Sequence, residues 1–344
     1  MKTYIIIALI LIACSSGFLQ AQDPVFSQFY NSPLYLNPAL AGQEQYGLVN
    51  FAHRSQWRAL QFPYTTYQAS LIMPYFQDKH KKPDGHLGGV GVSVYGDQAG
   101  VGRNLQTYGG NITFAYNVPL SRGDLNKLTF ALQGGFIQKR IDTDQLQWGE
   151  QYNPFIGFDN TVIPADLDRI QNRTFLDIGA GMFYRYFAPS VSNLVQSVYA
   201  GFVAAHLNRP DESVLEGETS RLPVLYKLHG GIIFGLNEKA SISLNYLSQQ
   251  QSDVNQTNFG AFLNYSMPFQ TAGTLSGLVA KIGTWYRVQD SFIAMIGFAT
   301  NHLELGFSYD WNTTSLRYNQ RGAGSYEVTL GYRFYKPGPP KVMY

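Results

Sequence analysis

The feature of this sequence that most constrains its fold is a regular alternation of apolar with polar or small residues. In the segment 326–334, one face carries tyrosine, valine, leucine, tyrosine and phenylalanine, and the other carries glutamate, threonine, glycine and arginine. A period of two places successive side chains on opposite faces of a β-strand, whereas a helix needs apolar residues three or four apart. The pattern recurs at 303–311, 176–186, 228–234 and 242–246. The sequence therefore predicts an all-β protein.

The composition narrows the class further. Charged residues make up only 14% of the 344 residues, against roughly 25% in soluble globular proteins. Aromatic residues reach 15%, which argues against disorder, because disordered chains have few aromatics and high net charge. The 25 Lys and Arg residues nearly balance the 23 Asp and Glu residues. We therefore expect no nucleic-acid partner, which would need a basic surface.

The first 21 residues have the features of a secretory signal peptide. Lys2 supplies a positive charge, residues 4–13 are almost wholly apolar, and a small-residue region follows, with Leu19-Gln20-Ala21 ahead of Gln22. Cleavage after Ala21 would leave Gln22 as the mature N-terminus. The segment Leu11-Ile12-Ala13-Cys14 also resembles a bacterial lipobox, after which Cys14, the only cysteine, would carry lipid. Both readings predict export.

The rest of the chain contains no run of the roughly 18 to 20 apolar residues that a membrane helix needs. Strands of an outer-membrane barrel instead alternate lipid-facing apolar residues with lumen-facing polar or small ones. A soluble β-sandwich also alternates, but its outward face is polar and charged. Here the second face is mostly Gly, Ser, Asn and Thr with scattered charge. We therefore expect a transmembrane antiparallel β-barrel over residues 45–335, located in the outer membrane of a Gram-negative bacterium.

Fourteen strands are predicted, near 45–56, 62–74, 86–97, 103–118, 126–141, 173–187, 194–207, 222–236, 239–251, 254–267, 276–288, 290–299, 301–312 and 323–335. An even number places both ends of the barrel on one side, so we expect both termini in the periplasm. The connections at 142–172, 208–222 and 312–322 are long, as external loops should be, and those at 235–239 and 300–302 are tight. The Pro-rich tail 336–344 cannot extend the last strand.

Residues 22–44 precede the first predicted strand and cannot themselves form one, because Pro24, Pro33 and Pro38 interrupt them. The segment is too apolar for a free tail. We expect it to lie inside the barrel as a plug, or against a periplasmic partner. Asn37 followed by Pro38 predicts a cap and a short helical turn, because Pro fits the first turn of a helix.

This segment also carries a family resemblance. Gln22-Asp23-Pro24, Phe26-Ser27-Gln28-Phe29 and Asn37-Pro38-Ala39 with Ala41-Gly42 resemble the opening signature of the PorP/SprF family of the type IX secretion system. The resemblance continues through His53-Arg54-Ser55-Gln56-Trp57 and Phe62-Pro63-Tyr64-Thr65-Thr66-Tyr67 to Gly331-Tyr332-Arg333-Phe334. It implies a protein that assists the export and surface anchoring of an adhesin or other secreted protein. The implied partners are the C-terminal region of that substrate, periplasmic secretion-ring subunits, or both, besides outer-membrane lipid.

Two groups of residues are candidates for partner binding or for plugging the barrel. The first lies in the N-terminal segment and comprises Asp23, Pro24, Phe26, Ser27, Gln28, Asn37, Pro38, Ala39 and Gly42. The second consists of four aromatic residues in the longest loop, Trp148, Tyr152, Phe155 and Phe158. Exposed loops rarely carry four aromatics without a partner or a fold-back contact. We therefore expect part of a protein-binding surface in this loop.

The sequence contains no catalytic or metal-binding pattern. The six histidines lie in separate segments, and no nucleophile elbow or phosphate-binding loop is present. We therefore expect neither an enzyme nor a bound cofactor. Two alternatives remain open. A plugged barrel could be a channel for small hydrophobic molecules, as in fatty-acid transporters, and a barrel hydrolase would need a Ser–His pair at its external rim.

Overall fold

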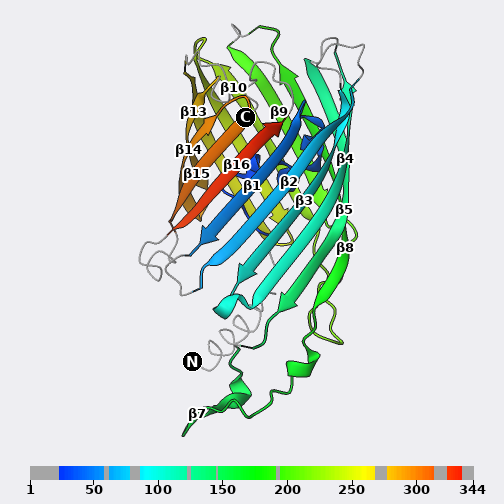
Figure 1. Ribbon diagram of the computed structural model, residues 1–344, viewed down its shortest axis with the longest axis vertical. Helices are drawn as coiled ribbons and strands as arrows, with labels where there is room; N and C mark the ends of the chain where they lie inside the picture. The colour runs from blue at the N-terminus through cyan, green and yellow to red at the C-terminus, as the bar shows by residue number, and fades with distance from the viewer. Residues whose placement is uncertain are drawn as a thin grey trace, which may run out of the picture.

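The computed structural model describes residues 23–57, 62–77, 86–121, 125–144, 146–190, 194–267, 277–313 and 324–334. Fourteen strands form a closed barrel (Figure 1). Their bounds are β1 (Gly47–Gln56), β2 (Tyr64–Gln77), β3 (His86–Ala99), β4 (Leu105–Pro119), β5 (Asn126–Ile141), β8 (Arg173–Phe187), β9 (Val195–Ala205), β10 (Leu225–Gly235), β11 (Ala240–Gln251), β12 (Val254–Ser266), β13 (Val279–Arg287), β14 (Ser291–Ala299), β15 (Leu303–Asn312) and β16 (Ser325–Phe334). The expected signal segment and the tail 336–344 lie outside the described residues.

Every barrel strand pairs antiparallel with its neighbours, and β1 pairs with β16 to close the sheet. The closing register runs from Gly47 opposite Phe334 to Ser55 opposite Tyr326. Closure leaves no unpaired sheet edge, which is a requirement for backbone crossing a bilayer. The predicted fold class and the number of barrel strands are therefore confirmed. A two-stranded hairpin, β6 (Tyr152–Asn153) and β7 (Gly157–Phe158), was not predicted.

The barrel has two different ends. We call the end where β1 begins and β16 ends the turn end; the tight turns 236–239 and 300–302 lie there. The opposite end, the loop end, carries the long connections 142–172 and 206–224. In Figure 1 the loop end is at the bottom, with β7 projecting below the barrel.

The two faces of the barrel wall differ sharply. Large apolar side chains on the outer face are exposed, among them Phe114 at 61% and Leu132 at 66%. The inward face is polar and buried, as at Thr113 and Thr329. This arrangement is the reverse of a soluble protein and fits a wall surrounded by lipid.

A charge placed on the outer face should destabilise the barrel. Leu330 lies in the middle of β16, opposite Phe51 and Leu305. We expect Leu330→Arg to lower the free energy of unfolding by about 2 to 4 kcal/mol, because lipid solvates arginine poorly near the bilayer centre. Urea unfolding in lipid vesicles, followed by tryptophan fluorescence, measures this change. Gln138→Arg is the control, because Gln138 hydrogen-bonds Thr174 near the loop end of the outer face; equal losses would contradict the assignment of the lipid face.

Candidate functional site: the N-terminal segment in the barrel lumen

Residues 23–46 precede β1 and form three short helical pieces, which are η1 (Phe29–Asn31), α2 (Pro33–Leu36) and η2 (Pro38–Gly42). Pro33 and Pro38 begin α2 and η2. Proline fits the first position of a helix because the backbone N–H that it lacks would have no helical hydrogen-bond partner there. The side chain of Asn37 accepts a 2.9 Å hydrogen bond from the Ala39 amide, so the predicted cap and helical turn are confirmed. No helix in the described part of the chain is long and apolar enough to cross a membrane.

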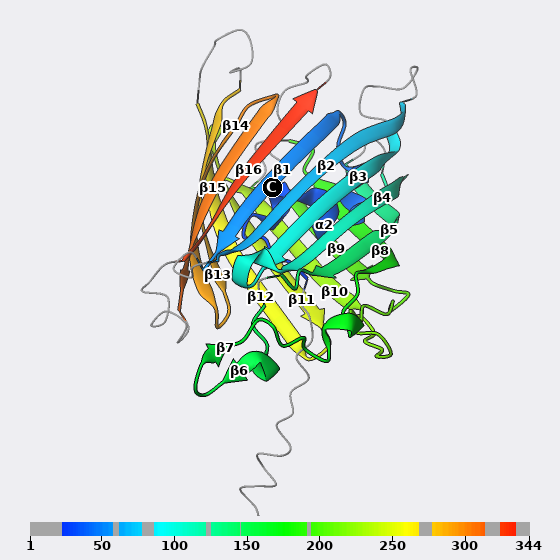
Figure 2. The same cartoon turned by 60° about the horizontal axis from the view of Figure 1, so that its bottom comes forward.

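The segment passes through the interior of the barrel (Figure 2). Asp23 contacts Gln251 and His206 at the loop end, and the Gly42 carbonyl accepts a 2.8 Å hydrogen bond from Asn117 near the turn end. Asp23 therefore lies at the opposite end of the barrel from Phe334. The expectation that both termini lie in the periplasm concerns residues 1–22 and 335–344, which lie outside the described residues, and it stays a prediction. The even strand count fixes only the two ends of the sheet, and the N-terminal segment adds one further pass through the lumen.

Apolar side chains of the segment pack against the inner wall. Phe26, Leu34 and Leu40 are almost fully buried, at 3%, 1% and 1% exposed. The ring of Phe29 meets Trp285 edge-on, with ring centroids 4.8 Å apart. Burying one such side chain contributes roughly 1.5 to 3 kcal/mol. The segment therefore provides apolar partners that the mostly polar inner wall lacks.

The wall makes room for this segment with small residues. A Cβ atom added at Gly89 of β3 would collide with the Ala41 carbonyl, and one at Gly181 of β8 would collide with the Asn37 side chain. The Asn37 side chain is held by its hydrogen bond from the Ala39 amide, and the Gly42 carbonyl next to Ala41 is held by the side chain of Asn117, so neither neighbour can easily withdraw. Glycine at these two positions lets the N-terminal backbone approach the sheet closely.

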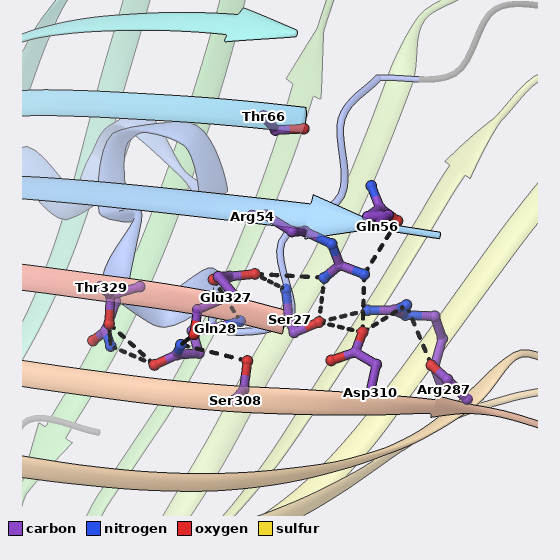
Figure 3. Close-up of polar contacts among 12 residues, drawn as sticks. Ser27, Gln28, Arg54, Gln56, Thr66, Arg287, Ser308, Asp310, Glu327 and Thr329 are labelled. Atoms are coloured by element: carbon purple, nitrogen blue, oxygen red, sulfur yellow. Dashed lines mark hydrogen bonds and ion pairs between the residues drawn. The ribbon is translucent and has the colours of Figure 1, made fainter. Parts of the chain in front are cut away.

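A buried ionic anchor holds the first part of the segment, and we define it as Ser27, Gln28, Arg54, Arg287, Asp310 and Glu327 (Figure 3). The backbone amides of Ser27 and Gln28 donate to the two carboxylate oxygens of Glu327, over 2.6 and 3.0 Å. The Ser27 hydroxyl donates to Asp310 over 2.6 Å. All six residues are buried, and the most exposed side chain among them, that of Arg287, is 6% exposed.

Two arginines neutralise the two carboxylates of this anchor. Arg54 lies 2.9 Å from Asp310 and 3.4 Å from Glu327, and Arg287 lies 3.4 Å from Asp310. Both arginines also hydrogen-bond the Ser27 hydroxyl. A buried charge is tolerated only when it is paired and hydrogen-bonded. Each carboxylate of the anchor has a cation within 3.4 Å, and Ser27 and Gln28 of the segment donate hydrogen bonds to both carboxylates.

Further polar contacts hold the middle of the segment. The side-chain nitrogen Nδ2 of Asn37 lies 3.0 Å from the Met182 carbonyl oxygen and 3.0 Å from His229 Nε2. Lys227 donates to the Tyr35 carbonyl over 2.8 Å, and its ammonium lies 4.3 Å from the centre of the Tyr35 ring. Lys227 and His229 therefore form part of a polar wall.

At the loop end, His206 bridges the segment to the wall. Its Nε2 lies 2.9 Å from Asp23 and its Nδ1 lies 2.8 Å from Asp177. Burial alone would lower the pKa of His206, but the two carboxylates outweigh it and raise the pKa to about 10. Burial likewise opposes ionisation of Asp23, yet His206 lowers its pKa to about 2. Because carboxylates occupy both ring nitrogens, His206 has no position free to activate a serine, which argues against the hydrolase alternative.

The four loop aromatics lie apart from the N-terminal group, beyond the barrel rim. Tyr152 and Phe158 belong to the β6–β7 hairpin, and their ring centroids are 5.4 Å apart. Phe155 at the hairpin tip is 94% exposed and Ile156 is 71% exposed. Trp148 is half-buried at the base of the same loop. The structure thus places the two predicted groups at separate locations.

Sequence reasoning missed the residues that hold the segment from the barrel side. Arg54, Arg287, Asp310 and Glu327 all lie on inward faces of strands and were not singled out. A signal existed, because isolated charges in alternating strands are rare in a chain with so little charge. Ser27 and Glu327 lie 300 positions apart in the sequence, so their pairing could not be deduced from spacing. Within the described residues, no group of three or more His, Cys, Asp or Glu is arranged to hold a metal ion.

The closed sheet, its apolar outer face and its long-looped end define an outer-membrane β-barrel protein. A model of the family described as type IX secretion system membrane protein PorP/SprF matches residues 18–332. The chain therefore belongs to the PorP/SprF family, as the N-terminal signature had indicated. The family is one of membrane proteins of the type IX secretion system.

Comparison with solved structures gives distant likenesses. The chain is similar to the TodX deltaS2S3 mutant monoaromatic hydrocarbon channel, with 11% identity, TM-score 0.47, and 88% of this chain and 94% of that chain covered. The CymD monoaromatic hydrocarbon channel shares 12% identity at a TM-score of 0.45, with 89% of this chain and 93% of that chain covered. A Pseudomonas aeruginosa FadL homologue shares 11% identity at a TM-score of 0.42, with 94% of this chain and 97% of that chain covered. No curated protein sequence matches the chain. The assignment therefore rests on the family match and on the barrel itself.

Removing one arginine of the ionic anchor should destabilise the protein strongly. Arg54→Met leaves Glu327 without its cation and Asp310 with Arg287 alone. We expect the free energy of unfolding to fall by about 3 kcal/mol or more, because a buried charge that loses its partner is costly. Urea unfolding in detergent measures the loss. The control is Arg169→Met, whose pair with Asp166 is exposed and should contribute less than about 1 kcal/mol; similar losses would refute the anchor.

The contact between Asp23 and His206 should depend on pH. The pKa of His206 is raised from 6.5 to about 10. The stabilisation that its positive charge gives the segment is therefore complete below pH 6.5 and is lost as the pH rises through 10. The pKa of Asp23 is lowered from 3.8 to about 2, so its contribution is lost only as the pH falls through 2. We expect a spin label at Val25→Cys to be immobile between about pH 4 and 6.5 and to become mobile toward pH 10.

His206→Asn is the matched variant for this titration, because asparagine tolerates the positive φ of 58° at this position. It should make the label mobile at every pH. His302→Gln, at a turn on the other end of the barrel, should leave the titration unchanged. A label whose mobility follows pH equally in the His206→Asn variant would show that another group titrates.

Proposed function

We propose that this chain acts in type IX secretion by binding an exported partner protein, and that the partner does not pass through its lumen. The observation that carries this proposal is the burial of residues 23–42 inside the barrel, from His206 at the loop end to Asn117 near the turn end. A lumen filled by the chain's own hydrogen-bonded segment leaves binding at the barrel ends as the available mode of action. No bond is made or broken in this function.

In this proposal the signature residues of the N-terminal segment close the lumen. Asp23, Ser27 and Gln28 bind wall residues through the contacts described above, while Asn37 and the helical turn that begins at Pro38 sit against Gly181. Phe26 and Ala39 are buried, and Gly42 leads the chain toward β1. Their role is therefore internal, and they would act on a partner only through the position of the segment.

The loop end supplies the surface for the partner. Phe155, Ile156 and Ile163 are 94%, 71% and 77% exposed on one loop. Water-facing apolar residues of this size commonly mark protein-binding sites. We propose that this surface, with Tyr152 and Phe158 supporting the hairpin, contacts the C-terminal region of the exported protein. The loop end then faces the cell exterior, and secretion-ring subunits would bind the turn end.

Polar substitutions at the hairpin tip should weaken partner binding while leaving the barrel intact. We expect Phe155→Ser with Ile156→Ser to reduce the co-purified surface protein at least tenfold, since buried aromatic anchors often dominate an interface. Purification from native outer membranes in mild detergent with quantitative mass spectrometry measures this. Glu216→Gln with Glu218→Gln, on the neighbouring loop, is the control.

The same experiment separates the partner classes. If ring subunits co-purify undiminished while the surface protein is lost, the loop end serves the substrate alone. If neither protein accompanies the wild-type barrel, the binding proposal fails. A lone barrel with bound small hydrophobic molecules would instead favour the channel alternative, which the buried charges of the lumen make less suitable.

A further inference from the structure

A second feature of the loop end is a cavity of about 490 Å³ next to the start of the N-terminal segment. The inner faces of β2 to β5 form one wall, and residues 212–222 of the long loop form another. Asp23 and Pro24 of the N-terminal segment complete the lining. Its size is that of a typical ligand site, and the mouths of β-barrels commonly hold such sites.

Asp97 on β3 is the unusual group in this cavity. It is only 7% exposed and accepts hydrogen bonds from the Tyr64 hydroxyl and, over 2.6 Å, from the Thr66 hydroxyl. Within the described part of the chain it has no ion pair, unlike Asp310, Glu327 and Glu304. A buried carboxylate without a cation is costly. The described residues therefore leave the Asp97 carboxylate without a counter-charge.

The other charged residues of the lining are already engaged or lie at the rim. Lys139 pairs with Glu212, and Asp23 pairs with His206. Arg140 is exposed. In the strand register Asp97 lies opposite Thr107, which lies opposite Lys139. Two strand spacings, about 10 Å, thus separate the backbones at Asp97 and Lys139, and the small side chain of Thr107 lies between them.

Two aromatic side chains line the same space. Tyr64 is held by its hydroxyl contact with Asp97 and by an edge contact with Trp57, with ring centroids 5.8 Å apart. Tyr95 packs edge-on against Tyr35 of the N-terminal segment, with ring centroids 5.7 Å apart. Aromatic faces attract cations and contact the apolar stems that carry them. The cavity therefore combines a carboxylate with aromatic and apolar walls.

We propose that this cavity binds an organic cation, an alkylammonium or guanidinium group on an apolar stem, with Asp97 as its counter-charge and Tyr64 and Tyr95 contacting the stem. Two sources share this chemistry, a Lys or Arg side chain of a polypeptide segment and a free amine. The site stands on its own geometry and does not depend on the proposed role in secretion.

Calorimetric titration of the full barrel in detergent tests the site. The probes are N-acetyl-lysine methylamide, its uncharged counterpart N-acetyl-norleucine methylamide, and butylamine. We expect the lysine probe to bind the wild type and the norleucine probe to bind at least tenfold more weakly, since a charge-assisted contact supplies most of the discrimination. Binding of the lysine probe tenfold tighter than butylamine assigns a polypeptide source, and equal binding assigns a free amine.

Asp97→Asn keeps the shape of the side chain and removes its charge, so we expect at least a tenfold loss of affinity for the lysine probe. Asp97→Glu should retain more of the affinity, and Asp159→Asn, on the exposed loop, should retain all of it. Migration on gels before and after heating verifies that each variant is a folded barrel. Undiminished binding by Asp97→Asn, or no binding by the wild type, would overturn the proposal.

One further variant excludes a cation from this chain itself. Arg58 lies outside the described residues and close in sequence to Tyr64. If the lysine probe bound only to Arg58→Gln, the chain would supply its own counter-charge and the proposal would be wrong. Failure of this titration leaves the secretion proposal intact, because co-purification with a partner protein is measured separately.

Discussion

The rest of the structure depends on the burial of two carboxylates, Asp310 and Glu327, inside the barrel. Charges removed from water must gain both counter-charges and hydrogen-bond donors. Arg54 and Arg287 supply the charge, while the Ser27 and Gln28 amides and the Ser27 hydroxyl supply the donors. The wall and the N-terminal segment are therefore energetically one unit, and neither satisfies its polar groups alone.

This dependence explains why the interior differs from an aqueous pore. The inward strand faces are polar, as in many outer-membrane barrels, yet Phe26, Leu34 and Leu40 fill the space between them and are nearly inaccessible to water. Small wall residues such as Gly89 and Gly181 let the segment lie close to the sheet. A barrel built in this way can present rigid surfaces at both ends, which suits a protein that binds partners.

How much of this could be predicted from sequence depends on the range of the interactions. Alternation is a local property, so the strands, the barrel class and the helical turn after Asn37 were predictable. The strand count fixed the ends of the sheet but not the direction in which residues 23–46 cross the lumen. The pairing of Ser27 with Glu327 joins positions 300 apart and arises only once β16 closes on β1. The β6–β7 hairpin was missed because its strands are only two residues each.

Hydrogen–deuterium exchange of the backbone amides of residues 26–43 tests the central claim most directly. The amides of Ser27 and Gln28 bond Glu327, and those of Leu36, Asn37 and Leu40 bond carbonyls within the segment. If the segment is anchored inside the barrel, these amides exchange as slowly as those of β1 and β16. Exchange at the rate of an unstructured peptide, with the strands still protected, would contradict the account.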